Sequence, residues 1–529
     1  MDKWDTSLTS ASGVSRRRFL KSAAAVGALA VSSSGSIFPA VAQSATAKKG
    51  GHFKIGVADG STTDSLDPAT WSSSFTETFG HSLHGYLTEL DPDGNLVGEL
   101  AEAWEPSKDA KTWTFKLRKG VEFHNGKTLS AEDVIASINH HRGEQSKSGA
   151  KTIVDPIEDI RSDGPQTVTV VLKQGNADFP YLLEDYHLAI MPSKDGSADT
   201  SGVGVGGYVL DATDFGVKAS SKRFANYWKP NAAWFDSFEI LAIHDVAART
   251  TALSTGQIHA MDKCELKTLH LLERNKNLKI SSLTGTQHYQ FPMLVDAAPF
   301  DNVDVRLALK HAVNRQQLLD TVLYGYGQLG NDHPISPSNR FFAKDLPQRE
   351  FDPDKAKFHL KKAGVSDLKV SLSAADSVFT GAVDAALVYQ QDAAKAGITI
   401  DVIREPSDGY WDNVWMKKPW CTTYWAGRPT ADWMFSQVYA ADAVWNETHW
   451  KNPRFNELLV AARGELDDVK RREMYAEMQL LCRDDGGTVI PLFANYVSAL
   501  SAKVGHNKIA SNWEWDGYRC AERWWFTDV

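Results

Sequence analysis

Residues 112–134 read TWTFKLRKGVEFHNGKTLSAEDV, and this stretch decides the fold class. Its first six residues, Thr112–Leu117, alternate polar and apolar side chains, which is typical of a half-buried strand. Ser130 is followed three residues later by Asp133, the arrangement of a capping box that begins a helix. A strand followed closely by a capped helix indicates a mixed α/β protein.

The same patterns recur along the chain. Phe53–Val57 and Thr167–Leu172 alternate like strands. Val303–Leu323 and Pro353–Ala363 carry apolar residues at helical spacing, and Gly364 stands where a helix C-cap is expected. We therefore expect strands and helices to alternate through an α/β fold without a fixed repeat.

The segments around the opening stretch are similar to those of a known family. LVGELAEAWE at 96–105 leads into it, and the whole resembles the signature of the peptide/nickel class of extracellular solute-binding proteins, which contains the dipeptide and oligopeptide binders. Further family-like segments are GG at 50–51, LDP at 66–68, GVGGY at 204–208, PFDNVDVRLAL at 299–309 and FDPDKA at 351–356. The resemblance covers nearly all of the chain beyond its first 42 residues.

This resemblance implies a clamshell of two α/β lobes with an extra inserted subdomain. Closure of the lobes on a hinge would bury a ligand between them, and two chain crossings between the lobes would make closure a rigid-body motion. The implied boundaries are 43–90 for the first part of lobe I, 91–199 for the inserted subdomain, 200–285 for the second part of lobe I, 286–499 for lobe II, and 500–529 for the return to lobe I.

Residues 1–42 differ in character from the rest. SRRRFLK at 15–21 precedes an apolar run at 23–31, and Ala40-Val41-Ala42 is a small-x-small cleavage site. This pattern resembles a twin-arginine signal peptide. The apolar run is shorter than the roughly 20 residues that span a bilayer. We expect export, cleavage, and a free periplasmic protein that begins near Gln43.

The net charge and the cysteine content exclude some classes of protein. Removal of residues 1–42 takes away five basic and two acidic side chains, so the net charge changes from −9 to −12. Such a charge argues against a nucleic-acid partner. Four scattered cysteines, Cys264, Cys421, Cys482 and Cys520, do not form a disulfide scaffold, although the sequence leaves one bridge open.

A tryptophan-rich segment is the densest candidate for a ligand site. Seven of the 17 tryptophans lie between residues 411 and 450. An indole brings a flat surface and an N–H donor, which suit it to enclose a ligand or to cover a cation. Burial in a core is the competing interpretation for each of them. The seven are Trp411, Trp415, Trp420, Trp425, Trp433, Trp445 and Trp450.

Within this segment, YWAGRPTAD at 424–432 occupies the place of the family's W-x-x-D motif. The resemblance implies an aspartate there that binds the α-ammonium group of a peptide, but here Arg428 stands at that position. Asp432 would restore the role only if the loop is rearranged. An arginine favours a carboxylate or phosphate, so we expect an anionic ligand; a surface or interlobe salt bridge is the alternative for Arg428. The candidate ligand-binding residues are Tyr424, Trp425, Gly427, Arg428, Asp432, Trp433 and Trp445.

Other apparent motifs carry less weight. GYGQLG at 325–330 matches G-x-G-x-x-G but follows a helical pattern, so we interpret it as a loop and expect no dinucleotide site. The pairs His81 and His84, and His140 and His141, have no further ligand at a diagnostic spacing, and we interpret them as surface or capping residues. We expect no metal, no cofactor and no catalytic residue.

The sequence therefore predicts the periplasmic solute-binding component of an ABC importer. It would act as a monomer, capture a peptide or peptide-like small ligand between two lobes, and deliver it to the permease subunits in the membrane. The alternative is an exported hydrolase of peptides or conjugates. Binding without turnover distinguishes the first from the second, which requires product formation.

Overall fold

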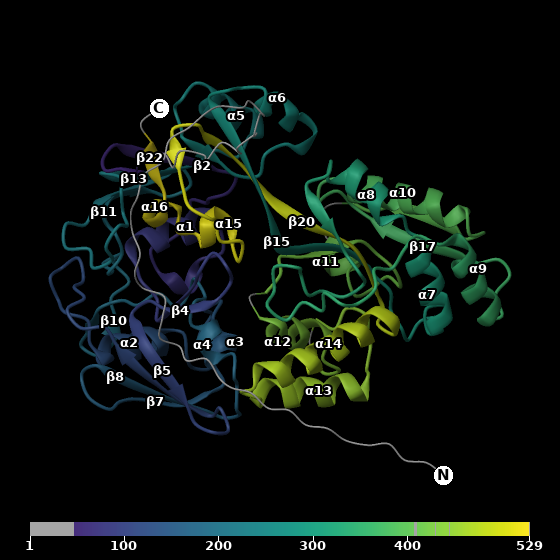
Figure 1. Cartoon of the computed structure of the whole chain (residues 1–529), viewed down its shortest axis with the longest axis horizontal. Helices are drawn as coiled ribbons and strands as arrows, with labels where there is room; N and C mark the ends of the chain where they lie inside the picture. The colour runs from purple at the N-terminus through teal and green to yellow at the C-terminus, as the bar shows by residue number, and fades with distance from the viewer. Residues whose placement is uncertain (1–46, 407–409, 429, 444, 528–529) are drawn as a thin grey trace, which may run out of the picture. The chain divides into compact units, whose positions relative to one another are not determined.

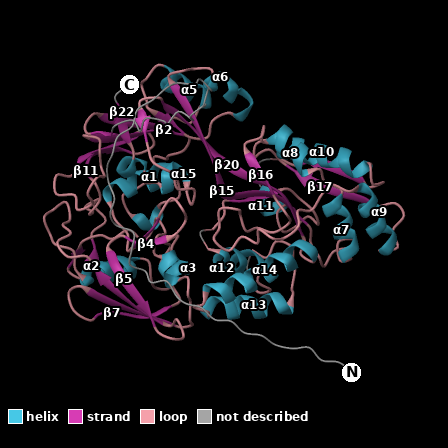
Figure 2. Cartoon of the chain, in the orientation of Figure 1, coloured by secondary structure: helices cyan, strands magenta, loops and turns pink. Residues whose placement is uncertain are grey.

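The computed structural model describes residues 47–406, 410–428, 430–443 and 445–527. The predicted signal peptide, residues 1–42, and the new N-terminus near Gln43 lie outside this part. The fold is mixed α/β, as predicted (Figure 2). In the described ranges, no helix is both long enough and apolar enough to cross a membrane.

One sheet runs through much of the molecule (Figure 1). Within the described residues it contains nine strands, and β16 (Gly327–Leu329) pairs with its neighbour β20 at the side of the main path. The other strands, in spatial order, are β11 (Tyr208–Asp214), β12 (Lys218–Arg223), β13 (Ser237–Ala242), β2 (His52–Val57), β14 (Ala260–Met261), β20 (Thr488–Ser501), β15 (Leu278–Pro292) and β19 (Thr423–Trp425).

Two long antiparallel strands, β15 and β20, connect the two halves of this sheet. At one end Leu278 pairs with Ser501, next to β14, and at the other end Pro292 pairs with Thr488. The register shifts between Thr284 and His288. Gly285 lies in this irregular stretch, where an added Cβ would come within 2.4 Å of the Tyr496 ring. The two strands thus cross together from one core to the next.

The first core, which we call lobe I, surrounds β2, β13 and α1 (Ser74–Leu83). Phe53, Phe75 and Phe238 are buried there together with Trp524 from the end of the chain. The C-terminal elements of this lobe are β21 (Val504–Gly505), α15 (Glu514–Gly517), α16 (Cys520–Arg523) and β22 (Trp525–Thr527), and β22 pairs with β1 (Ala47–Lys48). Both ends of the described chain therefore lie in lobe I.

The inserted subdomain has its own core, in which Trp113, Phe115 and Val170 are buried. It is built on an antiparallel sheet with α2 (Ala131–His140), α3 (Lys151–Val154) and α4 (Phe179–Leu182). The strands of that sheet, in spatial order, are β5 (Ala101–Pro106), β6 (Thr112–Leu117), β8 (Thr167–Leu172) and β7 (Ile157–Ser162). The hairpin of β3 (Thr88–Leu90) and β4 (Leu96–Gly98) precedes it.

Lobe II contains two further cores. Phe291, Tyr389 and Trp420 belong to one, and Phe435 and Tyr475 belong to the other. The helices are α7 (Val303–His311), α8 (Arg315–Val322), α9 (Pro353–Lys362), α10 (Ala382–Ala394), α11 (Tyr410–Asn413), α12 (Ala431–Met434), α13 (Pro453–Gly464) and α14 (Asp468–Asp484), and the parallel pair is β17 (Lys369–Ala374) with β18 (Thr399–Arg404). The boundaries implied by the resemblance remain a proposal, supported by this division into cores.

Several local predictions are confirmed. The three alternating segments are β2, β6 and β8, and the backbone N–H of Ser130 donates to Asp133 at 2.9 Å at the start of α2. Gly364 follows α9 with a φ of +73°. The predicted helical region 303–323 is divided into α7 and α8, because the Asn314 side chain accepts a hydrogen bond from the backbone of Gln317 and begins a new helix.

The interpretation of residues 325–330 as a loop is wrong, since Gly327–Leu329 form β16 on β20. The pairing is possible because glycine has no side chain. A Cβ on Gly327 would lie 2.6 Å from the carbonyl oxygen of Phe493, and one on Gly330 would lie 2.2 Å from that of Ile490. The glycines therefore permit close approach of two backbones.

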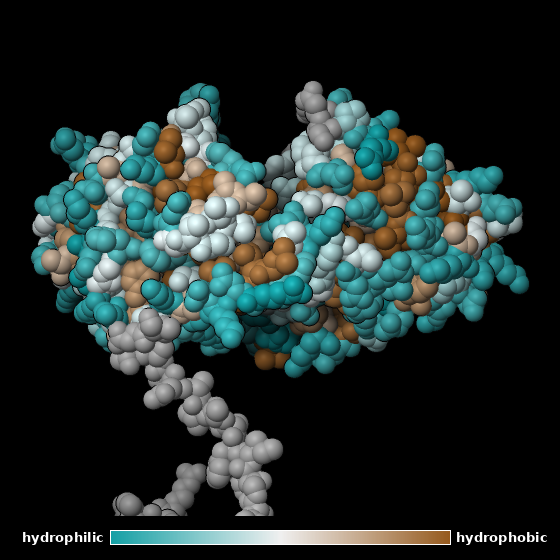
Figure 3. Space-filling view, turned by 90° about the horizontal axis from the view of Figure 1, so that it is seen from above, coloured by the Kyte–Doolittle hydropathy of each residue, from teal (hydrophilic) through white to brown (hydrophobic). Residues whose placement is uncertain are grey.

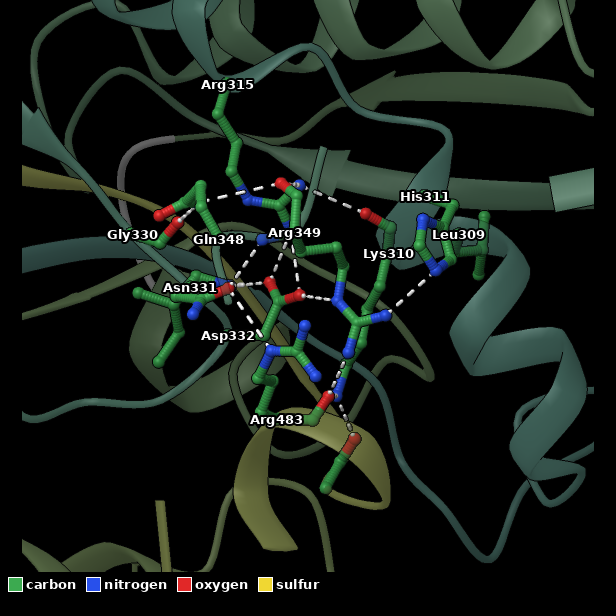
Figure 4. Close-up of polar contacts among 12 residues, drawn as sticks. Leu309, Lys310, His311, Arg315, Gly330, Asn331, Asp332, Gln348, Arg349 and Arg483 are labelled. Carbon is green, nitrogen blue, oxygen red and sulfur yellow. Dashed lines mark hydrogen bonds and ion pairs between the residues drawn. The ribbon is translucent and has the colours of Figure 1, made fainter. Parts of the chain in front are cut away.

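A charged cluster joins the parts of lobe II (Figure 4). Arg315 Nη2 lies 2.7 Å from both oxygens of Asp332, and Arg349 Nε lies 2.8 Å from Oδ2. Burial raises the pKa of Asp332, but the charges of Arg315, Arg349 and Lys310 hold it below its ordinary value. The charges of Arg315, Asp332 and Arg349 compensate one another, so we assign this cluster to stability and not to ligand binding.

All four cysteines are buried as free thiols. Cys421 and Cys482 lie in the two cores of lobe II, whereas Cys264 and Cys520 lie in lobe I. The disulfide that the sequence left open is not formed.

Candidate functional site

The candidate ligand loop leaves the sheet beside the strand crossing. In β19, Trp425 pairs with His288 of β15, and the chain then turns at Gly427. Gly427 has a φ of +62°, and a Cβ there would lie 2.1 Å from the hydroxyl of Thr286. Only glycine fits both the left-handed backbone and the close packing, so Gly427 places the following residue, Arg428, next to the crossing.

Arg428 is half-buried between aromatic rings. Its guanidinium carbon lies 5.6 Å from the ring centre of Trp425 and 5.5 Å from that of Trp433. Nε donates to Oε1 of Gln437 at 2.5 Å, and Nη1 donates to the Gly427 carbonyl at 2.7 Å. Within the described part of the chain, no carboxylate forms an ion pair with Arg428. The guanidinium is therefore oriented by neutral groups and keeps its charge uncompensated at contact distance.

Across from Arg428 lies the segment that follows α4 in the inserted subdomain. Burial lowers the pKa of Arg428, and the nearby groups of Tyr186 and Asp185 oppose that effect. The Tyr186 ring in turn lies 5.7 Å from Trp513 and 6.0 Å from Tyr518, which come from the C-terminal part of lobe I. Tyr186 of the inserted subdomain thus interacts both with Arg428 of lobe II and with two rings of lobe I.

Two cavities flank the strand crossing, and each is lined from lobe I and lobe II. One of about 550 Å³ has Asp91, Lys508 and Asn512 on one side and Thr286 and Arg340 on the other. Figure 3 shows the surface notched between the two halves. Cavities of this size, between lobes, are typical of small-ligand sites.

The second cavity, of about 530 Å³, has a different chemical character. Lobe I contributes Lys263 and Glu514, and lobe II contributes Tyr289, Phe379 and Tyr424. The rings of Tyr289 and Phe379 are stacked at 3.9 Å. This cavity has an aromatic wall opposite charged groups, and Gln287 reaches it from the same strand that brings Thr286 to the first cavity.

A buried carboxylate lies near this crossing on lobe I. Burial raises the pKa of Glu77 to about 7; a hydrogen bond with Tyr518 opposes the shift, and the charges of Glu514 and Asp59 add to it. Burial likewise raises the pKa of Glu184 to about 8. Burial therefore favours the protonated form of one carboxyl group in lobe I, Glu77, and of one in the inserted subdomain, Glu184.

The tryptophans form a connected wall on lobe II. Ring centres are 5.7 Å apart for Trp411 and Trp415, 6.4 Å for Trp415 and Trp425, and 5.7 Å for Trp425 and Trp445. Trp445 is 39% exposed and Trp411 is 42% exposed, whereas Trp425 is buried. Trp420 and Trp450 are core residues. The tryptophan-rich segment therefore contributes some of its rings to this wall and others to the cores of lobe II.

The predicted site residues do not all lie together. Trp425, Gly427, Arg428 and Trp433 form one group, and Tyr424 faces the second cavity. Asp432 is buried and its Oδ1 lies 3.1 Å from Nε of Arg463. Burial raises the pKa of Asp432 to about 6, although the charge of Arg463 opposes the shift. Asp432 is therefore already paired with Arg463. Trp445 lies at one exposed end of the tryptophan wall.

Sequence reasoning missed Tyr186, which acts on the charge of Arg428, and the rings of Trp513 and Tyr518, which pack on Tyr186. All three lie far from Arg428 in the chain, and no spacing rule connects them. Glu184-Asp185-Tyr186-His187, two acids followed by two aromatic rings, was the one local signal that marked this segment. Glu447, which contacts the tryptophan wall, carried no signal of its own.

Three of the four histidines in these pairs are buried and are not surface residues. His84 and His141 occupy the C-cap positions of α1 and α2, as the capping interpretation expected, but they and His81 are buried. His140 Nε2 lies 2.7 Å from Asp67. Over the ranges that the structure describes, no group of three or more histidine, cysteine or acidic side chains is arranged to hold a metal.

The chain is similar to several known proteins. It is 27% identical over 469 residues to the glutathione-binding protein GsiB of Escherichia coli, covering 85% of this chain and 90% of that one. Its fold matches DppA from Helicobacter pylori in complex with the peptide STSA, with a TM-score of 0.72, 22% identity, and coverage of 91% and 99%. It also matches AgaA from A. tumefaciens in complex with agropinic acid, with a TM-score of 0.72, 21% identity, and coverage of 90% and 99%.

Residues 95–447 match the family model described as the middle part of bacterial extracellular solute-binding proteins, family 5. This match spans well over half of the chain and includes both the opening stretch and the loop of Arg428. The two lobes joined by β15 and β20, with the subdomain inserted into lobe I, agree with it, and the protein is therefore a member of the family 5 extracellular solute-binding proteins.

Proposed function

We propose that this protein binds a small peptide-like ligand between its lobes, with an anionic group of the ligand at Arg428, and delivers it to the permease of an ABC importer. The observation that carries the ligand assignment is the guanidinium of Arg428, held between two indoles without a carboxylate partner in the described part of the chain. An arginine so placed can accept a carboxylate or phosphate through its remaining N–H groups.

The cleft supports closure around such a ligand. Tyr186 comes from the inserted subdomain, and Arg428 comes from the lobe on the other side of the strand crossing. Among the described strands, β15 and β20 join the sheet of lobe I to lobe II, and Gly285 lies where their register shifts. A hinge at this point would let lobe II rotate against lobe I and the inserted subdomain.

The ligand classes follow from the similar proteins. GsiB binds glutathione, DppA was solved with the peptide STSA, and AgaA was solved with agropinic acid. Glutathione and the peptide carry carboxylates, and agropinic acid is named as an acid. The peptide binders' ammonium-binding aspartate is replaced by Arg428, so we place the anionic group of the ligand there. Export through the twin-arginine route, a monomeric state and the permease partner belong to the same proposal.

A ligand screen tests the function. Thermal shift of the mature protein with glutathione, STSA and agropinic acid should raise the melting temperature for at least one of them, because a ligand that binds only the native state stabilises it. Calorimetric titration then gives the affinity, and chromatography of each mixture after prolonged incubation looks for products. Saturable binding with the ligand recovered intact supports the proposal. Conversion of the ligand would instead favour the exported hydrolase.

A further inference from the structure

One buried carboxylate, Glu447, connects three elements of the tryptophan wall. Its Oε1 accepts a hydrogen bond from Trp425 Nε1 at 2.8 Å and another from Gln290 Nε2, and its Oε2 accepts one from Trp415 Nε1 at 2.7 Å. Trp425 lies on β19, Gln290 on β15, and Trp415 just after α11. A single side chain thus ties the strand crossing to the loop of Arg428.

The environment of Glu447 is unusual for a glutamate. It is 3% exposed, and no lysine or arginine forms an ion pair with it in the ranges that the structure covers. An unpaired buried carboxylate is costly unless hydrogen bonds satisfy it. Three neutral donors do so here. An apolar side chain of similar size would serve folding alone at a lower desolvation cost. We therefore attribute to Glu447 the orientation of the indoles.

The contacts continue from Glu447 to Arg428. Trp425 donates its N–H to Glu447 and presents its ring to the guanidinium of Arg428 at 5.6 Å. Rotation of the Trp425 indole would move that face away. The indole N–H groups of Trp415 and Trp425 both donate to Glu447, so these two rings offer their faces and not their donors to a bound molecule.

We infer that Glu447 is a positioning residue of the ligand site, which acts through Trp425 to hold the guanidinium of Arg428 where it meets the anionic group of the ligand. This inference rests on the proposed function for its consequence in binding, but its first step, the control of Trp425 and Arg428, is independent of any ligand.

Two substitutions of Glu447 and one of Trp415 separate the parts of this arrangement. Glu447→Gln keeps one oxygen for Trp425 and Gln290 but turns an NH2 group toward the N–H of Trp415, so two donors face each other. Trp415→Phe removes that conflict. Glu447→Ala removes all three contacts. Glu405→Gln is the matched control, because Glu405 is another lobe II glutamate that accepts from Ser373 and, among the described residues, forms no hydrogen bond with a tryptophan.

The experiment uses protein labelled with ¹⁵N in indole and guanidinium groups, with the Trp415, Trp425 and Arg428 signals assigned by substitution. In Glu447→Gln the Trp415 N–H should lose its protection from exchange while the Trp425 signal persists, and Trp415→Phe in the same chain should restore the remaining wall signals. In Glu447→Ala the Trp425 N–H and the Arg428 Nε–H should both shift. Glutathione affinity, by titration calorimetry, should fall about tenfold in Glu447→Ala and by no more than about threefold in Glu447→Gln.

The outcomes are distinct. Unchanged Trp425 and Arg428 signals in Glu447→Ala would overturn the inference. If the alanine variant does not fold, an unchanged Trp415 signal in Glu447→Gln, or equal changes in Glu405→Gln, would overturn it as well. If the signals move as expected but wild-type protein binds no glutathione, peptide or agropinic acid, the positioning role stands and the proposed ligand class fails.

Discussion

The carboxylate of Asp178 lies 2.6 Å from the guanidinium of Arg471, and each side chain is 1% exposed. Asp178 precedes α4 in the inserted subdomain, whereas Arg471 belongs to α14 of lobe II. Arg340 of lobe II lies 3.0 Å from the same carboxylate, and the backbone N–H of Ala177 donates to the carbonyl of Arg463 at 2.7 Å. This ion pair therefore fastens the inserted subdomain to lobe II, and separation of the lobes would break it.

Asp178→Asn should favour the open form. Loss of one partner of a buried pair costs about 3–5 kcal/mol because the other charge is left unpaired, and opening relieves that cost by exposing Arg471 to water. Small-angle scattering of ligand-free protein should show a larger radius of gyration than wild type, and glutathione should bind more weakly. Asp133→Asn is the control: Asp133 is buried and paired with Lys127 inside the inserted subdomain, so it should lower the melting temperature without changing the radius. Equal radii for all three proteins would refute the fastening role.

Arg428→Ala should abolish most binding. Removal of one member of a desolvated charged pair costs about 2–5 kcal/mol, or roughly 30-fold to several-thousand-fold in affinity. Arg428→Lys should recover little, since an ammonium group does not reproduce the planar fork. Gln437→Ala is the matched control, because it removes the partner of Nε and leaves the charge. Calorimetric titration with glutathione measures all four proteins. Near-equal glutathione affinities of wild type and the two Arg428 variants would show that Arg428 orders its own loop and does not bind the ligand.

Glu77→Gln should stabilise the protein at neutral and alkaline pH. The folded state raises the pKa of Glu77 from 4.5 to about 7, so it holds a proton that the unfolded chain has released. Stability due to this group therefore falls as pH rises from 4.5 towards 7 and stays lower above that, by a total on the order of 3 kcal/mol. The melting temperature of the variant minus that of wild type should increase from about pH 5 to about pH 8. Parallel curves would show that Glu77 titrates normally.

Lys310→Met should destabilise lobe II. The Lys310 ammonium, buried near the end of α14 (Figure 4), donates to the carbonyls of Cys482, Arg483 and Gly486 at 3.1, 3.0 and 2.7 Å. Methionine fills similar space but removes all three hydrogen bonds. The Cys482 and Arg483 carbonyls keep other donors, Gly486 N and Arg349 Nη2, whereas the Gly486 carbonyl loses its donor, which should cost about 1–3 kcal/mol. Urea unfolding measures the change, with Lys361→Met on the exposed side of α9 as the control. A urea midpoint equal to that of Lys361→Met would show that the hydrogen bonds of Lys310 do not stabilise lobe II.

Export should depend on the paired arginines of the signal. Arg16→Lys together with Arg17→Lys should prevent accumulation in the periplasm, because the export receptor reads the pair. Arg18→Lys changes the variable position of the same motif and should leave export unchanged. Immunoblots of periplasmic and cytoplasmic fractions give the result. Normal periplasmic yield of the double variant would show that a different route exports the chain.

Local patterns in the sequence were enough for several strands and helices and for the family, although they missed β16 and the division between α7 and α8. Alternation identified β2, β6 and β8, the Ser130 and Asp133 pair identified the start of α2, and the ordered family segments implied two lobes with an inserted subdomain. These features depend on neighbours a few residues apart, whose side-chain period and hydrogen bonds are set by the helix or strand itself. The family segment singled out Arg428 as a candidate ligand residue, but its place between two indoles came from the structure.

The tertiary structure decided which groups meet. Asp432 is paired with Arg463, Glu447 holds Trp415 and Trp425, Tyr186 faces Arg428, and Gly327 lies in a strand on β20. Each of these contacts joins segments that are distant along the chain. Their formation depends on the register of β15 with β20 and on which charges are removed from water together, and neither is encoded in the spacing of residues along one element. The sequence by itself therefore determined the elements and the family, and only their packing decided the chemistry of the cleft.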